Sequence, residues 1–287
     1  MKPSPFAYSA PQSLEEALAV LAEVAGDGKV LAGGQSLLPI LNMRLAAPAH
    51  VVDINRLAEL SYVTVTDDSV RVGALARHAE LERDADAHEA LPLLRQALRL
   101  VAHPVIRNRG TTVGSLAHAD PSGEMTAVLS LTGGTVTAAR QGSTREVTAS
   151  DFFVGPLESC LEAGELAVAA TFPRLPERSG STFVEVARRH GDYAVCGVAA
   201  VVTLDADGAV ASARTAYISV AHTPLVLDLT EAVAGRVVAA ADWAAAGELA
   251  GTQVDPEGDI HATADYRRHL ARVLTGRALS EAAGRAA

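Results

Sequence analysis

The sequence is poor in cysteine and in aromatic residues. Its 287 residues include two cysteines, Cys160 and Cys196, and aromatic side chains make up 4% of the chain. An iron–sulfur cluster usually needs four thiolates, and a disulfide-stabilised fold needs several cysteine pairs. The two cysteines therefore exclude both a cluster held by this chain alone and a disulfide framework.

An excess of positive charge is also missing. The chain has 24 Lys and Arg against 34 Asp and Glu, for a formal net charge of −10. An acidic surface repels nucleic-acid phosphates and anionic lipids. We therefore expect no nucleic-acid partner, and a phosphate-bearing cofactor must be held by local dipoles rather than by the overall field.

Long apolar runs are absent as well. No uncharged stretch approaches the roughly 20 residues that cross a bilayer, and Met1–Phe6 lacks the apolar run of a signal peptide. These absences predict a cytoplasmic protein without a membrane span.

The length and composition fit two domains. Domains usually hold roughly 100–200 residues, and 49% of this chain is hydrophobic, enough for a sizeable core. The best linker is Arg174–Ser181, which contains Pro176 and Gly180. We place the boundary there, giving domains at 1–175 and 176–287.

Helical and strand patterns are mixed along the chain. Ser13 and Glu16 form a capping-box pattern before a helix, and Pro92 interrupts a helical stretch over 78–102. Further helical patterns lie at 37–45, 124–131, 231–250 and 263–283. Strand patterns lie at 30–32, 51–54, 62–66, 70–72, 135–139, 145–148, 168–172, 198–204 and 210–220.

The first segment suited to chemistry is Ala32-Gly33-Gly34-Gln35-Ser36, which follows a strand and precedes a helix. Two glycines let the backbone turn sharply and leave its N–H groups uncovered. Such groups form an anion-binding concavity, and the helix N-terminus adds partial positive charge. For an isolated Gly-Gly-Gln-Ser, an ordinary tight turn is the more frequent explanation.

The second segment is Gly110–Ser115, followed by Leu116–Pro121. Thr111, Thr112 and Ser115 can donate hydrogen bonds to phosphate or ribose oxygens. Two such bends can clamp the two phosphates of one dinucleotide. Neither bend has the spacing of a Rossmann glycine motif or of a phosphate-binding Walker motif.

Other constellations favour structural roles. Ser115, His118 and Asp120 have the residue types of a nucleophilic triad, but triad members normally converge from separate segments. His118 with Asp120, or His190 with Asp192, lacks a third metal ligand at helical spacing. Hydrolase and metal chemistry are therefore disfavoured. The basic cluster Arg188-Arg189-His190 is typical of a solvated face.

The two bends together resemble a known family. Ala32–Pro39 is similar to the first FAD loop of the molybdopterin dehydrogenase flavoproteins, and Arg107–Pro121 resembles their second. Gly191-Asp192-Tyr193-Ala194 resembles a third motif just past the linker. The resemblance covers essentially the whole chain, and the medium subunits of aerobic carbon monoxide dehydrogenase and its relatives are the nearest match.

This resemblance implies an α+β fold. An FAD-binding region of two subdomains, like that of the vanillyl-alcohol oxidase group and divided near residue 55, would precede a small C-terminal α+β domain with a three-stranded sheet. It also implies FAD as the cofactor. A small subunit with two [2Fe–2S] clusters and a large molybdenum-cofactor subunit would be the partners, in a dimer of heterotrimers.

Roles for individual residues follow from the resemblance alone. The first loop would wrap the FAD diphosphate with Ala32, Gly33, Gly34, Gln35, Ser36 and Leu37. The second loop would meet the diphosphate and the flavin side with Thr111, Thr112, Val113, Gly114 and Ser115, and His118 and Asp120 would lie nearby. Glu124 would approach the adenosine ribose, Leu166 the adenine or ring edge, and Tyr193 the isoalloxazine. No residue of this chain is expected to be catalytic.

Two positions depart from the family pattern. Val113 replaces a glycine of the common Thr-Ile-Gly-Gly-Ser form, so the approach of the backbone to the cofactor is expected to differ at that point. Some members have a cofactor-contacting lysine near Phe183-Val184-Glu185, where this chain has none.

The hypothesis is an electron relay. Substrate is oxidised at molybdenum in the large subunit, and electrons pass through the clusters to this FAD and on to an external acceptor. Two alternatives stay open: a stand-alone FAD-dependent oxidoreductase, and an assembly subunit that has lost FAD. Carbon monoxide, a nitrogen heterocycle and an aromatic thioester remain as substrates of the complex, with quinone, NAD, a cytochrome or oxygen as acceptor.

Overall fold

The computed structural model describes residues 2–286 and begins with a small parallel sheet covered by one helix. The order is β1 (Ala7–Ser9), β3 (His50–Asp53), β2 (Gly28–Leu31). Helix α1 (Leu14–Val24) buries Ala17, Leu18 and Leu21. Two short 3₁₀ turns, η1 (Ala25–Asp27) and η2 (Ala58–Leu60), and helix α2 (Leu37–Asn42) complete this region.

The capping pattern at Ser13 is half confirmed. Ser13 Oγ accepts from the Glu16 N–H at 3.2 Å, as expected for an N-cap. The Glu16 carboxylate accepts from the N–H of Gln12 at 2.7 Å rather than from Ser13. The helix start is as predicted, but the reciprocal bond is displaced by one residue.

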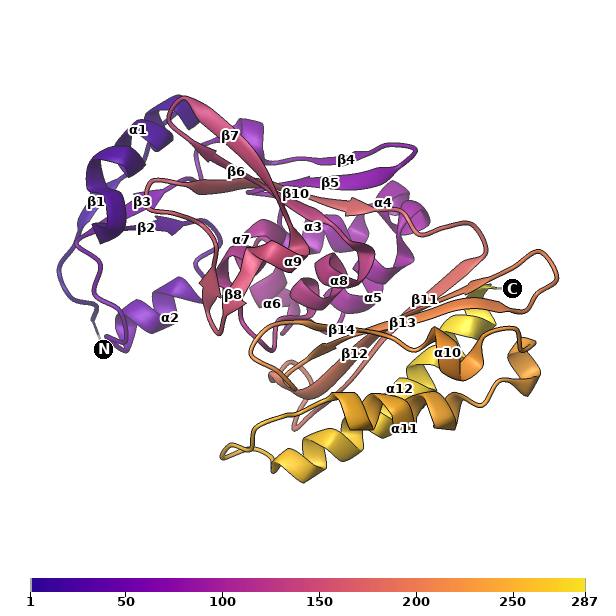
Figure 1. The fold of residues 1–287 in the computed structure, drawn as a ribbon. Coiled ribbons are helices and arrows are strands. Elements are labelled where there is room, and N and C mark those ends of the chain that lie inside the picture. Colours follow the sequence, from indigo (N-terminus) through magenta and orange to yellow (C-terminus); the bar gives the residue numbers. More distant parts are fainter. Residues whose placement is uncertain (1, 287) are drawn as a thin grey trace.

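An antiparallel five-stranded sheet forms the centre of the N-terminal half (Figure 1). Its order is β4 (Val63–Val65), β5 (Ser69–Gly73), β10 (Leu166–Pro173), β6 (Thr135–Arg140), β7 (Ser143–Thr148). The strands predicted at 62–66 and 70–72 pair as the hairpin β4–β5, and those predicted at 135–139 and 145–148 pair as β6–β7. A two-stranded hairpin, β8 (Phe153–Gly155) with β9 (Glu158–Ser159), precedes β10.

Short helices pack between this sheet and the C-terminal half. They are α3 (His78–Arg83), α4 (Ala85–Ala90), α5 (Pro92–Leu98), α6 (Pro104–Arg107), α7 (Thr112–His118), α8 (Glu124–Thr132) and α9 (Ala149–Phe152). The helical stretch predicted from residue 78 is divided twice. Asp84 caps α4 through the Ala87 N–H at 2.8 Å, and Pro92 opens α5, where its missing N–H costs nothing.

The C-terminal half contains a four-stranded antiparallel sheet. Its order is β11 (Ser179–Ala187), β12 (Ala194–Leu204), β13 (Val210–Ile218), β14 (Leu225–Asp228). The expectation of three strands holds for the three long ones, and the short edge strand β14 is additional. The predicted linker is shorter than expected, because Ser179 already pairs with Thr203.

Alternate residues of β12 face opposite layers. Val198, Ala200 and Val202 join one apolar core with the C-terminal helices, whereas Ala199 and Val201 belong to the core of the N-terminal half. Those helices are α10 (Thr230–Val233), α11 (Trp243–Gln253) and α12 (Ala264–Ala286), with η3 (Val238–Ala240). Figure 1 shows α11 and α12 on the outer side of this sheet. The sheet is therefore a layer buried on both faces, which explains its nearly continuous apolar strands.

Across residues 2–286, no helix has the length and apolar character that a membrane span requires.

Candidate functional site

The first predicted bend connects β2 to α2. Gly34 has a φ of 73°, and the Gln35 side-chain amide donates to Gly33 O at 3.0 Å. Within residues 2–286, none of the backbone N–H groups of Gly33, Gly34, Gln35 and Ser36 donates a hydrogen bond. Four adjacent donors are thus available to an anion at the N-terminal end of α2.

The two predicted bends touch each other. A Cβ added to Gly33 would lie 2.4 Å from Arg109 O and 2.7 Å from Gly110 Cα. Only a residue without a side chain permits this approach of two backbones. Segments far apart in the sequence therefore share one site.

Two side chains hold this junction together. Asn55 Nδ2 donates to Ala32 O at 2.8 Å, and its Oδ1 accepts from Arg77 Nη2 at 2.7 Å. Arg77 Nη1 donates to Arg109 O at 2.7 Å. Asn55 and Arg77 were not predicted as site residues. The signal for Asn55 was its position just after the strand ending at Asp53, where an asparagine commonly bonds to nearby backbone.

Asp53 supports this clamp as a charged carboxylate. Its Oδ2 accepts from the Tyr8 hydroxyl at 2.7 Å, and its Oδ1 accepts from the Asn55 N–H at 2.9 Å. Burial acts to raise the pKa of Asp53, but the hydrogen bonds from Tyr8 and Asn55 outweigh it, so the pKa is lowered. Asp53 thereby fixes the orientation of the Asn55 amide.

The second bend uses most of its donors internally. Thr111 caps α7, with its Oγ1 accepting from the Gly114 N–H at 3.2 Å. The N–H of Thr112 donates to Ala76 O at 3.3 Å and that of Ser115 to Thr111 O at 3.0 Å. The expectation of bare amides at both bends is therefore met at the first bend and not at the second.

Two side chains of the second bend point inward. The Thr112 hydroxyl lies 3.2 Å from His78 Nδ1, in a buried contact, so this hydroxyl is not presented to a phosphate. Val113 is 1% exposed and belongs to the apolar core. The valine that replaces the family's glycine thus packs away from the junction of the two bends.

His78 is neutral in this site. Burial, followed by the charge of Arg107, lowers the pKa of His78 to about 4. The imidazole of His78 therefore adds no positive charge to the junction of the two bends.

Two acidic residues, Glu124 at the start of α8 and Glu185 on β11, are close enough to interact electrostatically. Burial, and next the charge of Glu185, raise the pKa of Glu124 to about 8, and burial raises the pKa of Glu185 to about 7. Glu185 Oε2 is buried and has no hydrogen-bond partner within the described chain. A buried carboxyl oxygen without a protein partner calls for an explanation, and a hydroxyl of a bound ligand would supply one. Glu185 was not predicted as a site residue.

Tyr193 extends from the loop between β11 and β12 and is 69% exposed. Partial desolvation and the negative charges of Asp120 and Glu124 raise the pKa of its phenol. Its neighbour Ala194 is anchored, because Ser219 Oγ donates to Ala194 O at 2.7 Å. The third predicted motif therefore lies beside residues that follow the second.

The remaining predicted residues have different surroundings. Ala32, Leu37, Ser115 and His118 are half-buried. Leu166 is 4% exposed and opens strand β10, where it pairs with Ala139 in the apolar core. Any contact of Leu166 with a ligand would therefore be limited to its backbone or a small part of its side chain.

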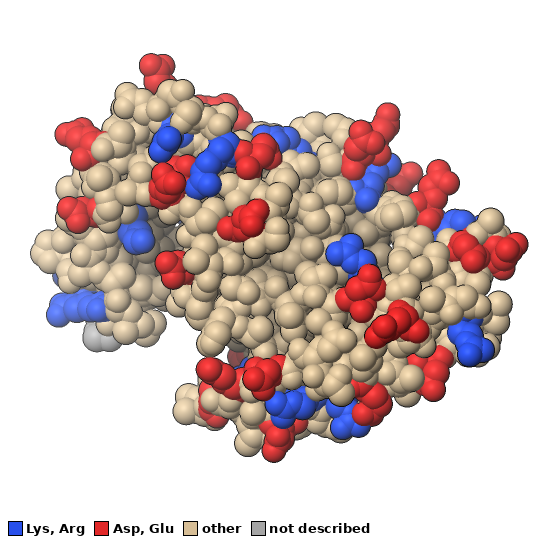
Figure 2. Space-filling view, viewed as in Figure 1, with Lys and Arg blue, Asp and Glu red and all other residues tan. Residues whose placement is uncertain are grey.

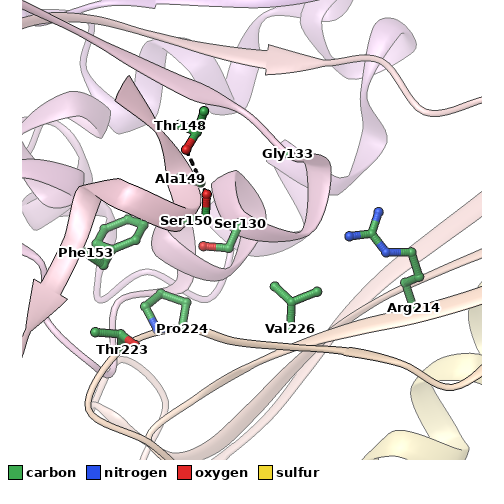
Figure 3. Close-up of a pocket in the computed structure, with 10 residues that line it drawn as sticks. All are labelled: Ser130, Gly133, Thr148, Ala149, Ser150, Phe153, Arg214, Thr223, Pro224 and Val226. Carbon is green, nitrogen blue, oxygen red and sulfur yellow. Dashed lines mark hydrogen bonds between the residues drawn. The ribbon is translucent and has the colours of Figure 1, made fainter. Parts of the chain in front are cut away.

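A separate cavity of about 460 Å³ contains none of the predicted residues. Figure 3 shows it between the end of α8 and strands β13 and β14. It is lined by Ser130, Gly133, Thr148, Ala149, Ser150, Phe153, Arg214, Thr223, Pro224 and Val226.

Metal-binding geometry is not found in the part of the chain that the structure describes: no group of three or more His, Cys, Asp or Glu residues is arranged to hold an ion. Cys196 is buried, and burial raises the pKa of its thiol to about 12.

The fold and these bends define an α+β dinucleotide-binding protein, whose donors suit a diphosphate and whose buried carboxyls suit sugar hydroxyls. Residues 4–175 match the family model described as the FAD binding domain in molybdopterin dehydrogenase, and residues 181–282 match the CO dehydrogenase flavoprotein C-terminal domain. The chain belongs to this family of FAD-binding flavoproteins, so the resemblance seen in its motifs is confirmed.

Known relatives match the chain from end to end. It is 39% identical to the 6-hydroxypseudooxynicotine dehydrogenase complex subunit alpha of Paenarthrobacter nicotinovorans, over 100% of this chain and 97% of that protein. It is also 39% identical to the caffeine dehydrogenase subunit beta of Pseudomonas sp. (strain CBB1), over 99% and 97%. Among solved structures, the carbon monoxide dehydrogenase of Hydrogenophaga pseudoflava has a TM-score of 0.93 at 34% identity, over 100% of both chains.

Proposed function

We propose that this chain binds FAD across its two bends and serves as an electron-relay subunit of a molybdenum hydroxylase. The observation that carries the proposal is the row of four free backbone donors at Gly33–Ser36, held against the second bend by Asn55 and Arg77. Such donors bind a diphosphate without cationic side chains, which suits a chain with a net charge of −10.

The residues present fit each part of FAD. The N–H groups of residues 33–36 would bind the diphosphate, with Gly114 and Ser115 adjoining it. Glu124 and Glu185 would accept from, or donate to, ribose hydroxyls, and Tyr193 would cover part of the isoalloxazine. The other predicted residues would support these contacts from the surrounding elements; they are Ala32, Leu37, Thr111, Thr112, Val113, His118, Asp120 and Leu166.

When bound, FAD supplies the exchange of one or two electrons, which links one-electron centres to two-electron acceptors. The chain's own residues bind and orient the cofactor, and Tyr193 limits access to it. Oxidation of the substrate would take place at molybdenum in the large subunit, so no residue of this chain is proposed as an acid or base.

We propose two partner subunits: a small one with [2Fe–2S] clusters and a large one with the molybdenum cofactor, assembled as a dimer of heterotrimers. In support, two relatives of nearly equal length are named as subunits of dehydrogenases. The full-length match favours a subunit over the stand-alone oxidoreductase. We also propose the division into domains at 1–175 and 176–287, and a cytoplasmic location, which cell fractionation would test.

The substrate of the complex is proposed to be a nitrogen heterocycle. The two relatives at 39% identity are named for 6-hydroxypseudooxynicotine and caffeine, both nitrogen heterocycles, whereas the carbon monoxide dehydrogenase is 34% identical. Assaying the purified complex with both substrate classes separates the two possibilities.

Reconstitution tests the central part of the proposal. The purified chain is incubated with FAD and freed of excess cofactor, and the flavin-to-protein ratio is read from the visible spectrum. We expect a ratio near one. A correctly folded chain that retains no FAD would instead support the alternative of an assembly subunit that has lost its cofactor.

A further inference from the structure

The loop of residues 188–193 joins β11 to β12 and carries Tyr193. Its internal contacts are few: the Asp192 N–H donates to Arg189 O at 3.1 Å, and Arg188 lies 3.7 Å from the Asp192 carboxylate. An exposed ion pair of this kind contributes at most about 1 kcal/mol. The position of Tyr193 therefore depends on the anchored start of β12 at Ala194 and on what the loop rests against.

The loop rests on the imidazole of His103. Gly191 has a φ of 85°, and a Cβ at this position would lie 2.6 Å from Cε1 and 2.8 Å from Nε2 of His103. The ring of His190 meets the same imidazole edge-on, with centroids 5.8 Å apart and planes at 66°. Two successive residues of the loop thus contact one ring, and one of them must be glycine to do so.

The backbone at His103 is held in place, while its side chain is exposed. His103 directly precedes α6, and its carbonyl accepts from the Arg107 N–H at 3.1 Å. The Arg107 side chain is buried, donates to Val101 O at 3.0 Å and Ala102 O at 3.2 Å, and pairs with Glu82 at 2.8 Å. The segment that carries the imidazole is therefore fixed by a buried cation whose donors are satisfied.

We propose that His103 is a positioning residue: its imidazole holds the Gly191 turn and thereby keeps Tyr193 beside Asp120 and Glu124, against the flavin ring. This proposal rests on the proposed function, because it requires FAD in the site. Removing the imidazole should release Tyr193 while leaving the Gly33–Ser36 donors, and hence FAD binding, intact.

The test uses the full chain loaded with FAD and compares flavin fluorescence at equal flavin content. An aromatic ring against the flavin quenches its emission, so His103→Ala should raise the fluorescence several-fold. His103→Phe, which keeps a flat ring under Gly191, should stay near the unmodified protein. His222→Ala is the matched control, because His222 is an exposed histidine on the β13–β14 loop.

A double substitution shows whether the effect passes through Tyr193. In a Tyr193→Ala background, His103→Ala should add little, since coupled residues give non-additive effects. Equal increases in both backgrounds, or a His103→Ala protein with full FAD and unchanged fluorescence, would overturn the proposal while leaving the proposed function in place.

Two further outcomes are distinguished by the same set of proteins. An unmodified chain without FAD contradicts the proposed function itself. If His103→Ala does not fold, Gly191→Ala disturbs the same contact from the loop side and should give the same rise; unchanged fluorescence in that variant would then contradict the positioning role.

Discussion

At the scale of single residues, Gly33 has the clearest physical requirement. Its Cα approaches the backbone of Arg109 and Gly110 so closely that a methyl group would overlap Arg109 O. The sequence indicated that glycine is needed here because it lets the backbone turn sharply and leaves the N–H groups uncovered. The contact with the second bend could not be predicted, because it depends on how distant segments pack.

Gly33→Ala should therefore weaken FAD binding. Forcing an extra carbon into a packed contact costs about 1–3 kcal/mol, and if that cost falls on the bound state the affinity weakens by roughly five- to 150-fold. A fluorescence titration with FAD measures this loss. Gly26→Ala is the control, since a Cβ at Gly26 meets nothing within 4 Å; equal losses in both variants would refute the role of the contact.

Glu124 gives a pH dependence with a definite sign. Its carboxyl has a pKa of about 8 in the folded chain against an ordinary 4.5, so the folded state binds more protons than the unfolded state between these values. The contribution to stability is then complete below about pH 4.5 and is lost as the pH rises through 8, by up to about 1.4 kcal/mol per pH unit.

Thermal unfolding of the FAD-free chain measures this effect. The Tm should fall between pH 6 and pH 9, and Glu124→Gln should flatten that fall. Glu23→Gln, on the exposed face of α1, should leave it unchanged. An equally steep fall in the Glu124→Gln protein would show that another group is responsible.

At the scale of elements, the junction between the two bends is held by side chains from other segments. Asn55 follows β3, and Arg77 precedes α3, yet together they bond to the backbone at Ala32 and Arg109. Motif spacing identifies the bends but carries no sign of the residues that fix them. For this reason the site was only partly predictable.

Arg77→Ala should destabilise this junction. Each lost hydrogen bond from a charged donor costs about 1.5–3 kcal/mol, and both bends lose a restraint, so FAD affinity should fall as well. Urea unfolding and FAD titration measure the two effects. Arg77→Lys should not restore the stability or the FAD affinity, because one ammonium cannot bond to both Asn55 and Arg109 as the guanidinium does. Arg236→Ala, at an exposed position, is the control; full affinity in Arg77→Ala would exclude the clamp.

Strand β11 shows what the sequence pattern conceals. Its residues Ser179–Ser181 read as a linker because small polar residues and glycine are typical of loops. They nevertheless pair with β12. The other long strands were predictable because their apolar runs are continuous, as expected for a sheet covered on both faces.

At the scale of the whole molecule, the distribution of charged side chains bears on how a phosphate-bearing cofactor is held. Acidic and basic side chains are interspersed over the face shown in Figure 2, and no large basic patch lies there to attract phosphate. The proposed function therefore assigns diphosphate binding to the backbone N–H groups at the junction of the two bends.

The stabilisation of the folded chain by a ligand tests whether the two bends contribute to cofactor binding. FAD at a hundred times its Kd should stabilise the protein by about 2.7 kcal/mol and raise its Tm. Riboflavin, which lacks both the diphosphate and the adenosine, should raise the Tm much less at the same concentration. Equal shifts with both ligands would mean that the bends contribute little to binding.

The most direct measurement is a crystal structure of the chain with FAD bound. Diphosphate oxygens should lie within hydrogen-bonding distance of the backbone N–H groups of Gly33–Ser36, with Asn55 and Arg77 still bonded to the backbone at Ala32 and Arg109. A diphosphate held by arginine side chains, with those four N–H groups facing water, would contradict the account.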